Sequence, residues 1–174
     1  MKPTLYIMCG LSFSGKTSLA KQLAGFLEAT VLSYDHDIWT VFKPTLPKDI
    51  TKTDEWVFIE TKAREHIAKL LQAGKNVIFD DLSVEVRDRD ALRKTASENG
   101  ANSIVVYMDT PIEEVIRRQK TNSITQERDV TSDENMRLVI SQLQPPTTDE
   151  VAVTIRPDYV VSDVIAEIHA LNRS

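Results

Sequence analysis

Residues 10–17 read Gly-Leu-Ser-Phe-Ser-Gly-Lys-Thr, a full match to the pattern G-x-x-x-x-G-K-[ST], and they directly follow the apolar residues 5–9. Glycines at both ends of such a segment let consecutive backbone N–H groups curve around an anion. The pattern is typical of a loop that leads from a β-strand into a helix and binds phosphate at the positive N-terminal end of that helix. It therefore favours an α/β fold with a nucleotide site near the start of the chain.

The side chains of this loop have separate predicted roles. We expect Lys16 to reach the outer phosphates of a bound nucleotide and the hydroxyl of Thr17 to ligate Mg²⁺. The residues predicted to contact the nucleotide are Gly10, Leu11, Ser12, Phe13, Ser14, Gly15, Lys16, Thr17 and Ser18.

The rest of the chain alternates short apolar segments with amphipathic ones, which predicts a parallel sheet covered by helices on both faces, a three-layer α/β sandwich. The predicted strands are 4–9, 30–34, 76–80, 102–108 and 151–155. The predicted helices are 16–27, 38–42, 54–73, 84–99, 111–119, 132–143 and 159–172, and the proline-containing segments 43–53 and 144–150 are predicted loops. No repeat or linker divides the chain, so we expect residues 1–174 to form a single domain.

Composition narrows the range of functions. The chain has 174 residues, a formal net charge of −5 and a sequence pI near 5.3, so its surface as a whole does not attract nucleic-acid phosphates. It has no apolar run long enough for a membrane span or a secretory signal, and its lone Cys9 has no internal disulfide partner. We therefore expect a cytoplasmic protein with no membrane partner, in which Cys9 is a small buried residue.

Acidic residues follow three of the predicted strands, at the edge where an open α/β sheet binds its ligand. The second strand leads into Asp35 and Asp37, and the third leads into Asp80 and Asp81. Ionised carboxylates at the end of a buried strand are costly unless they are paired or bind a cation, so this grouping predicts a Mg²⁺ site and a general base. Alternatively, Asp35 or Asp37 caps the helix 38–42, and Asp80 and Asp81 are ordinary turn residues. The fourth strand leads into Asp109, which we expect to cap the helix that begins at Pro111.

A basic cluster precedes a polar segment later in the chain. Arg117 and Arg118 lie near the end of a predicted helix, residues 120–131 are polar and poor in hydrophobic side chains, and Arg128 lies among them. Arginines that close over a phosphoryl group stabilise its charge and exclude water. We therefore predict an arginine-bearing lid at about 118–131. The alternative is a solvated helix end whose arginines complement the helix dipole.

Two further arginines, Arg87 and Arg89, lie near the start of their predicted helix. The helix dipole disfavours cations at this end. Either a bound anion holds at least one of them there, or they pair with the neighbouring acids Glu85, Asp88 and Asp90. Both explanations fit the sequence.

Taken in order, these motifs resemble those of the small P-loop kinases, a group that includes the zeta-toxin, chloramphenicol phosphotransferase, gluconate kinase and polynucleotide kinase domains. The resemblance rests on the phosphate loop, on Asp35 after the second strand, on the segments 70–81 and 105–111 and on the arginine lid, and it covers residues 4–150. It implies an ATP-dependent kinase with a five-stranded parallel sheet in the order 2-3-1-4-5.

The same resemblance implies roles for individual residues. It places the general base at Asp35, the acid linked to the metal at Asp80 or Asp81, and the lid arginines at Arg118 and Arg128.

Two departures from the family pattern concern the acceptor side of the site. Phe13 stands where such loops more often carry a small residue, so we expect it to reshape the acceptor side of the loop. Leu82-Ser83 replaces a Thr-Asn pair, which removes a polar contact to the acceptor. These differences affect the prediction of the acceptor more than the prediction of ATP binding.

Together the motifs predict transfer of the γ-phosphoryl group of ATP, with Mg²⁺, to a hydroxyl of a small molecule. One alternative acceptor is the 5′-hydroxyl of a nucleic acid, which requires a basic, aromatic-lined groove that the acidic composition does not favour. Another alternative is a non-catalytic ATP-binding module. We expect the acceptor within residues 36–60, against Trp39, Phe42 and either Trp56 or Arg89. The sequence carries no signal for oligomeric state or for ATP over GTP.

Overall fold

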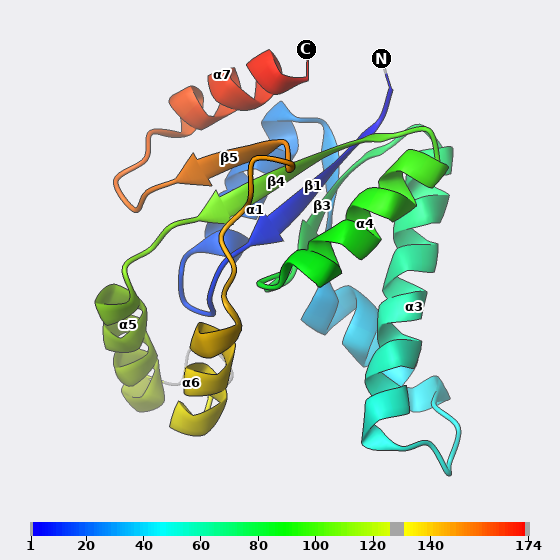
Figure 1. Cartoon of the computed structure of the whole chain (residues 1–174), viewed down its shortest axis with the longest axis vertical. Helices are drawn as coiled ribbons and strands as arrows, with labels where there is room; N and C mark the ends of the chain where they lie inside the picture. The colour runs from blue at the N-terminus through cyan, green and yellow to red at the C-terminus, as the bar shows by residue number, and fades with distance from the viewer. Residues whose placement is uncertain (1, 126–130, 173–174) are drawn as a thin grey trace.

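A single sheet of parallel strands forms the centre of the computed structural model, which describes residues 2–125 and 131–172 (Figure 1). The strands are β1 (Thr4–Cys9), β2 (Ala29–Ser33), β3 (Asn76–Asp80), β4 (Asn102–Met108) and β5 (Ala152–Ile155). Their order is β2-β3-β1-β4-β5, and every neighbouring pair is parallel. The order implied by the family resemblance is therefore confirmed.

Helices connect the strands. The longer ones are α1 (Lys16–Phe26), α3 (Lys52–Gln72), α4 (Val86–Glu98), α5 (Ile112–Thr125), α6 (Asp133–Gln142) and α7 (Val161–Leu171). Between β2 and α3 lie three short turns: the π-helix η1 (Tyr34–Trp39), α2 (Thr40–Phe42) and the 3₁₀-helix η2 (Lys43–Thr45). None of the helices in the described ranges is long and apolar enough to cross a membrane.

The helices cover both faces of the sheet, which confirms the predicted three layers. Because successive residues of a strand point to opposite faces, Leu5 and Ile7 of β1 pack toward α3 and α4, whereas Tyr6 and Met8 pack toward α1 and α7. The helices contribute Leu19, Leu23, Val164 and Ile168 on one face and Ile59, Ile67, Leu71 and Leu92 on the other.

Helices α5 and α6 lie beyond the carboxyl ends of the strands, apart from the two covering layers (Figure 1). A separate apolar cluster of Leu11, Val84, Val115 and Met136 joins these helices to the segments that follow β1 and β3. The phosphate loop is thereby packed against the part of the chain that carries the predicted arginine lid.

Helix α5 is longer than predicted. It continues to Thr125 instead of ending at residue 119, so the first residues of the predicted lid are helical. Gln119 and Asn122 are buried within it, and the side-chain amide of Gln119 donates to the carbonyl of Thr131 at 2.9 Å, just before α6. Polarity alone did not reveal that these amides are buried. Arg128 lies outside the described residues.

Candidate active site

The phosphate loop has the backbone geometry that its glycines were predicted to provide. Gly10 has a φ of +141° and Gly15 has a φ of +108°. A Cβ atom at Gly10 would lie 3.0 Å from the carbonyl oxygen of Met108, so no larger residue fits without a shift. The N–H of Gly10 donates to the carbonyl of Leu82 at 3.0 Å, which joins the loop to the end of β3.

The loop ends at the start of α1, as the motif requires. Lys16 is the first residue of this helix and is buried, and its Nζ donates to the carbonyl of Leu11 at 2.7 Å. Thr17 and Ser18 follow it in the first turn, where backbone N–H groups have no partner within the helix. These N–H groups can donate hydrogen bonds to a phosphate, so the start of α1 is suited to phosphate binding.

Arg118 comes from α5 and reaches the loop, which agrees with its predicted position near the phosphates. Its Nη1 donates to the carbonyls of Phe13 at 3.1 Å and Ser14 at 3.3 Å. Its Nε donates to Glu114 at 2.7 Å, and Arg117 donates to the same carboxylate. These hydrogen bonds from Arg117 and Arg118 lower the pKa of Glu114 to about 2.

A cavity of about 370 Å³ lies against the outer side of the loop, lined by Phe13, Gly15, Ser18, Arg118 and Thr121 among others. Phe13 itself adopts a left-handed conformation, with a φ of +64°, and packs against the apolar cluster that joins α5 and α6. It therefore lines this cavity rather than the separate pocket beside Asp81 described below.

The two acids after β3 have different surroundings. Asp80 is 8% exposed and pairs with Ser33 across the β2–β3 ladder. Asp81 is partly buried and faces a pocket. Burial raises its pKa to about 6, against the opposing effects of a hydrogen bond from the backbone of Leu82 and of the Lys16 charge.

The two acids after β2 lie in a helical turn instead of a loop. The turn η1 begins directly after the strand, and Ser33 caps it, because its hydroxyl accepts from the N–H of His36 at 3.4 Å. The carboxylate of Asp37 accepts from the N–H of Ser33 at 2.7 Å. The alternative that Asp35 or Asp37 caps a helix beginning at residue 38 is therefore wrong, because Ser33, five residues before Ile38, already caps an earlier turn.

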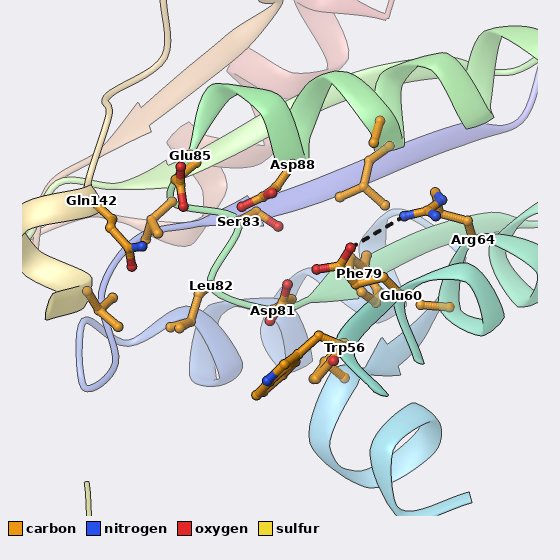
Figure 2. Close-up of a pocket in the computed structure, with 16 residues that line it drawn as sticks. Trp56, Glu60, Arg64, Phe79, Asp81, Leu82, Ser83, Glu85, Asp88 and Gln142 are labelled. Atoms are coloured by element: carbon orange, nitrogen blue, oxygen red, sulfur yellow. Dashed lines mark ion pairs between the residues drawn. The ribbon is translucent and has the colours of Figure 1, made fainter. Parts of the chain in front are cut away.

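A pocket of about 220 Å³ opens beside Asp81, between η1, α3, α4 and the β3–α4 segment (Figure 2). One wall is aromatic: the rings of Tyr34 and Trp56 are stacked with centroids 6.4 Å apart, and Phe79 meets Tyr34 edge-on. The remainder combines apolar side chains of α3, α4, α6 and the β3–α4 segment with four carboxylates, those of Glu60, Asp81, Glu85 and Asp88, and Arg64 lies beside Glu60.

The carboxylates of this pocket influence one another. Burial raises the pKa of Glu60, and the charge of Asp88 raises it further. Burial likewise raises the pKa of Asp88, followed by the charge of Glu85. Since Asp88 also raises the pKa of Asp81, these side chains form one acidic cluster, as Figure 2 shows.

Of the residues predicted to surround the acceptor, Trp56 lines this pocket and Phe42 does not, and a role of the pocket in binding the acceptor stays a prediction. Trp39 packs behind Trp56, with ring centroids 5.1 Å apart. Arg89 does not line the pocket, because it is fully buried on the other side of the β3–α4 segment. The sequence analysis missed Glu60, although its position four residues after Trp56 places both on one face of α3.

The two arginines near the start of α4 have different roles. Arg87 pairs with Glu85 at 2.9 Å and with Asp88 at 3.5 Å, which confirms the ion-pair alternative for this residue. Arg89 makes a two-pronged ion pair with Glu150, at 2.7 and 2.8 Å, and neither side chain is exposed. Both explanations for Arg89 were therefore wrong, because its partner lies 61 residues away in sequence.

Cys9 has the structural role that was predicted for it. It is fully buried at the end of β1, where burial raises the pKa of its thiol to about 11. Arg89 contacts its sulfur at 3.6 Å.

The residues predicted to hold Mg²⁺ fit a metal that shares its ligands with a nucleotide. Within residues 2–125 and 131–172, no group of three or more histidine, cysteine or acidic side chains could hold a metal by itself. Mg²⁺ in nucleotide sites usually takes one or two protein ligands, water and the phosphates. Thr17 with Asp80 or Asp81 supplies that number, and their role as ligands stays a prediction.

Comparison with known proteins agrees with this geometry. The profile of the AAA domain family matches residues 5–146. No curated protein matches the chain by sequence.

Solved structures share the whole fold at low sequence identity. An APS kinase from Mycobacterium tuberculosis, in complex with AMPPNP and APS, has 20% identity, a TM-score of 0.72 and 99% coverage of both chains. A sugar kinase from Janibacter has 17% identity and a TM-score of 0.69 over 99% of this chain and 95% of its own. A gluconokinase from Sinorhizobium meliloti has 17% identity and a TM-score of 0.64 over 99% and 93%. The chain thus belongs to the AAA domain family and has the fold of the small P-loop kinases.

Proposed function

We propose that this protein is a kinase that transfers the γ-phosphoryl group of ATP to a hydroxyl group of a small molecule. The observation that carries the proposal is that the phosphate loop and the acidic pocket meet at Asp81. This carboxylate lines the pocket together with the next residue, Leu82, whose carbonyl accepts from the N–H of Gly10 in the phosphate loop at 3.0 Å. A donor on the loop and an acceptor in the pocket would therefore be neighbours.

Different residues of the chain would bind the phosphates and the metal. The loop amides of residues 10–15 and Lys16 would hold the phosphates, and Thr17 with Asp80 or Asp81 would hold Mg²⁺. When bound, the nucleotide and its metal supply the phosphoryl group and neutralise its charge. Arg118 already donates a hydrogen bond to the loop, at the carbonyl of Phe13. Together with Arg128, it would stabilise the charge of the transferred group.

Asp35 is the better candidate for the general base. The carboxylate of Asp37 is engaged with the backbone of Ser33 at 2.7 Å. The carboxylate of Asp35 is exposed, and its charge contributes to raising the pKa values of Tyr34 and Asp81, which both line the pocket. Asp35 is therefore close to the place where an acceptor hydroxyl would lie.

The proposed reaction balances without any further reagent. The acceptor oxygen forms a bond to the γ-phosphorus, and the bond from that phosphorus to the bridging oxygen breaks. The bridging oxygen keeps the electron pair and leaves with ADP. The hydroxyl proton passes to the carboxylate of Asp35.

The alternatives are less well supported. The structures with the same fold are described as kinases of APS, of sugar and of gluconate, which favours a small acceptor. A pocket lined by four carboxylates repels the phosphates of a nucleic acid. A non-catalytic module would bind ATP and transfer nothing, and the variants below distinguish it. The lone buried Cys9 supports our further proposal of a cytoplasmic location.

The first test is Lys16→Ala, because this side chain is expected to hold the outer phosphates. Calorimetry with ATP and Mg²⁺, together with an assay of ADP release, should show a loss of turnover of at least about 100-fold. Lys21→Ala, an exposed lysine on the same helix, is the matched control and should behave like the wild type. If the wild type has no affinity for any nucleoside triphosphate, the proposed function is wrong.

The second test is Asp35→Asn, which removes the proposed base without changing the size of the side chain. Nucleotide affinity should stay within about twofold, whereas phosphoryl transfer should fall about 100-fold or more. Asp37→Asn serves as the comparison, since we expect it to weaken the η1 turn rather than the transfer step. Equal transfer by Asp35→Asn and the wild type, with a loss in Asp37→Asn, would move the base to Asp37.

A further inference from the structure

The pocket beside Asp81 carries more negative charge than the surrounding protein balances. Four carboxylates line it, against the single guanidinium of Arg64, which lies 3.8 Å from Glu60. The other nearby cation, Arg87, is 75% exposed and pairs with Glu85 and Asp88 from the solvent side. The side chains of Glu60 and Asp88 are 51% and 40% exposed, and the burial of their remaining surface raises the pKa of both.

A second observation, independent of the acids, indicates that the pocket is built for a ligand. Ser83 is 2% exposed, and its hydroxyl makes no hydrogen bond within the described residues. It lines the pocket, and Figure 2 shows it pointing into the space between Asp88, Glu60 and Asp81. The buried hydroxyl of Tyr34, on the aromatic wall, also has no hydrogen-bond partner there. Buried polar groups are normally satisfied, so these hydroxyls indicate a missing partner.

The aromatic wall suits the same kind of ligand. Trp56 is 52% exposed and lines the pocket, and Tyr34 is stacked on it. Aromatic faces attract organic cations, and carboxylates beside them add to this attraction. A bare metal ion is a weaker candidate, because the described residues contain no metal-binding group of three or more such side chains.

The segment that contains Asp81 indicates how a molecule in the pocket would be oriented. Leu82, the residue after Asp81, lines the pocket and its carbonyl accepts from the N–H of Gly10 in the phosphate loop at 3.0 Å, whereas Glu60 and Asp88 line the pocket from α3 and α4. A molecule in the pocket therefore has one end beside the phosphate site and the other between Glu60 and Asp88.

We propose that the acceptor is a small hydroxyl compound that carries a protonated amine, with the amine held by Glu60, Asp88 and the hydroxyl of Ser83 and the reacting hydroxyl directed toward Lys16. The proposal rests on the proposed kinase function and adds the chemical class of the acceptor. An amine of this kind donates hydrogen bonds to the carboxylates and to Ser83 and balances the charge that Arg64 leaves uncompensated.

The test compares probes that differ in charge and share most of their hydroxyl groups. ADP release from ATP is measured with three pools: aminosugars and amino alcohols, their N-acetylated or neutral counterparts, and the corresponding sugar acids. Glucosamine, N-acetylglucosamine, glucose and gluconate form one matched set within the pools. We expect stimulation by the amine pool, at least about tenfold above the other two.

Substitutions of the pocket acids then test whether the preference for amines depends on this pocket. For the stimulating amine, Glu60→Gln and Asp88→Asn should each raise KM about tenfold or more, since each removes one charged hydrogen bond. Glu65→Gln, on the exposed side of the same helix as Glu60 and paired with Lys62, is the matched control and should leave KM unchanged. Nucleotide calorimetry on every variant checks that it is folded.

Three results would overturn the inference. They are greater stimulation by the neutral pool, greater stimulation by the acid pool, and no stimulation by any amine from a protein that binds ATP with Mg²⁺. Displacement of the amine by Mg²⁺ or Ca²⁺ alone at millimolar concentration would assign the acids to a metal and would also overturn it. A protein without nucleotide affinity would instead refute the proposed function, so the two failures are distinguishable.

Discussion

Two groups of charged side chains lie beside the segment between β3 and α4, and they differ in burial and in how well the protein balances them. In one group, Arg89 donates to Glu150 through two nitrogens and to the carbonyls of Ser83 and Val84 through the third. Glu150 also accepts from the N–H of Thr147. In the other group, the pocket acids face a cavity whose lining includes the cation Arg64, which lies 3.8 Å from Glu60, while Glu85 and Asp88 pair with the exposed Arg87.

The difference separates a structural role from a binding role. A buried ion pair whose hydrogen bonds are all made internally holds two segments of the chain together and offers nothing to a ligand. Partly exposed acids with few internal partners destabilise the free protein less, because water screens them, and a bound cation removes the remaining cost. The Arg89–Glu150 pair therefore joins the loop 144–150 to α4 and the segment before it, whereas the pocket beside Asp81 is where we propose that the substrate binds.

The largest expected effect comes from breaking the balanced pair. Glu150→Gln leaves the guanidinium of Arg89 buried without its counterion, so the free energy of unfolding should fall by about 3–5 kcal/mol, measured by urea denaturation. Glu98→Gln is the control, because Glu98 makes an exposed pair with Lys94 at 3.7 Å and should change stability by less than about 1 kcal/mol. A loss below about 1 kcal/mol for Glu150→Gln would remove the contrast between the two groups.

Removing the charge of a pocket acid should have the opposite effect and raise the free energy of unfolding. The pKa of Asp81 is raised from 3.8 to about 6, so ionised Asp81 destabilises the folded protein. This cost is absent below about pH 4, where the carboxyl is protonated in both the folded and the unfolded state, and it is complete once the pH has risen through 6. Asp81→Asn should therefore stabilise the ligand-free protein by about 1–3 kcal/mol at pH 8 and by little at pH 4.

Thermal unfolding at the two pH values checks this prediction for Asp81. Asp49→Asn, at an exposed position, serves as the control and should show no such pH dependence. Destabilisation by Asp81→Asn at pH 8 would mean that the protein already balances this carboxylate.

A smaller effect is expected at Ser83, which has a φ of +42° and a hydroxyl without a partner among the described residues. Ser83→Gly relieves the left-handed strain and removes the unsatisfied group, which should raise stability by about 1 kcal/mol, partly offset by the greater freedom of glycine in the unfolded chain. Ser83→Ala keeps the strained backbone and should gain less, as measured by urea denaturation. Equal stability of the two variants would show that the backbone strain is negligible.

The phosphate half of the site was predictable because its requirements are local. The positive φ values of Gly10 and Gly15 and the position of Lys16 at the start of α1 follow from one contiguous motif. The alternation of apolar segments and helices likewise predicted the three layers, since each segment shows its own period. The strand order came from the family resemblance.

The acceptor half was only partly predictable. Trp56 was identified by its place in the chain, yet Tyr34, Glu60 and Asp88 were missed because they come from three separate elements that only the packed fold brings together. Local charge patterns were also misleading for Arg89, whose acidic neighbours on α4 suggested partners that the structure does not use.

The sequence by itself determined where a phosphate can bind and what kind of sheet carries the loop, because backbone conformation and hydrophobic period depend on neighbouring residues. Only the tertiary structure decided which charges are balanced. Whether a carboxylate meets Arg89 or an open pocket depends on how η1, α3, α4 and the loop 144–150 pack around β3, and those contacts join residues far apart in the chain.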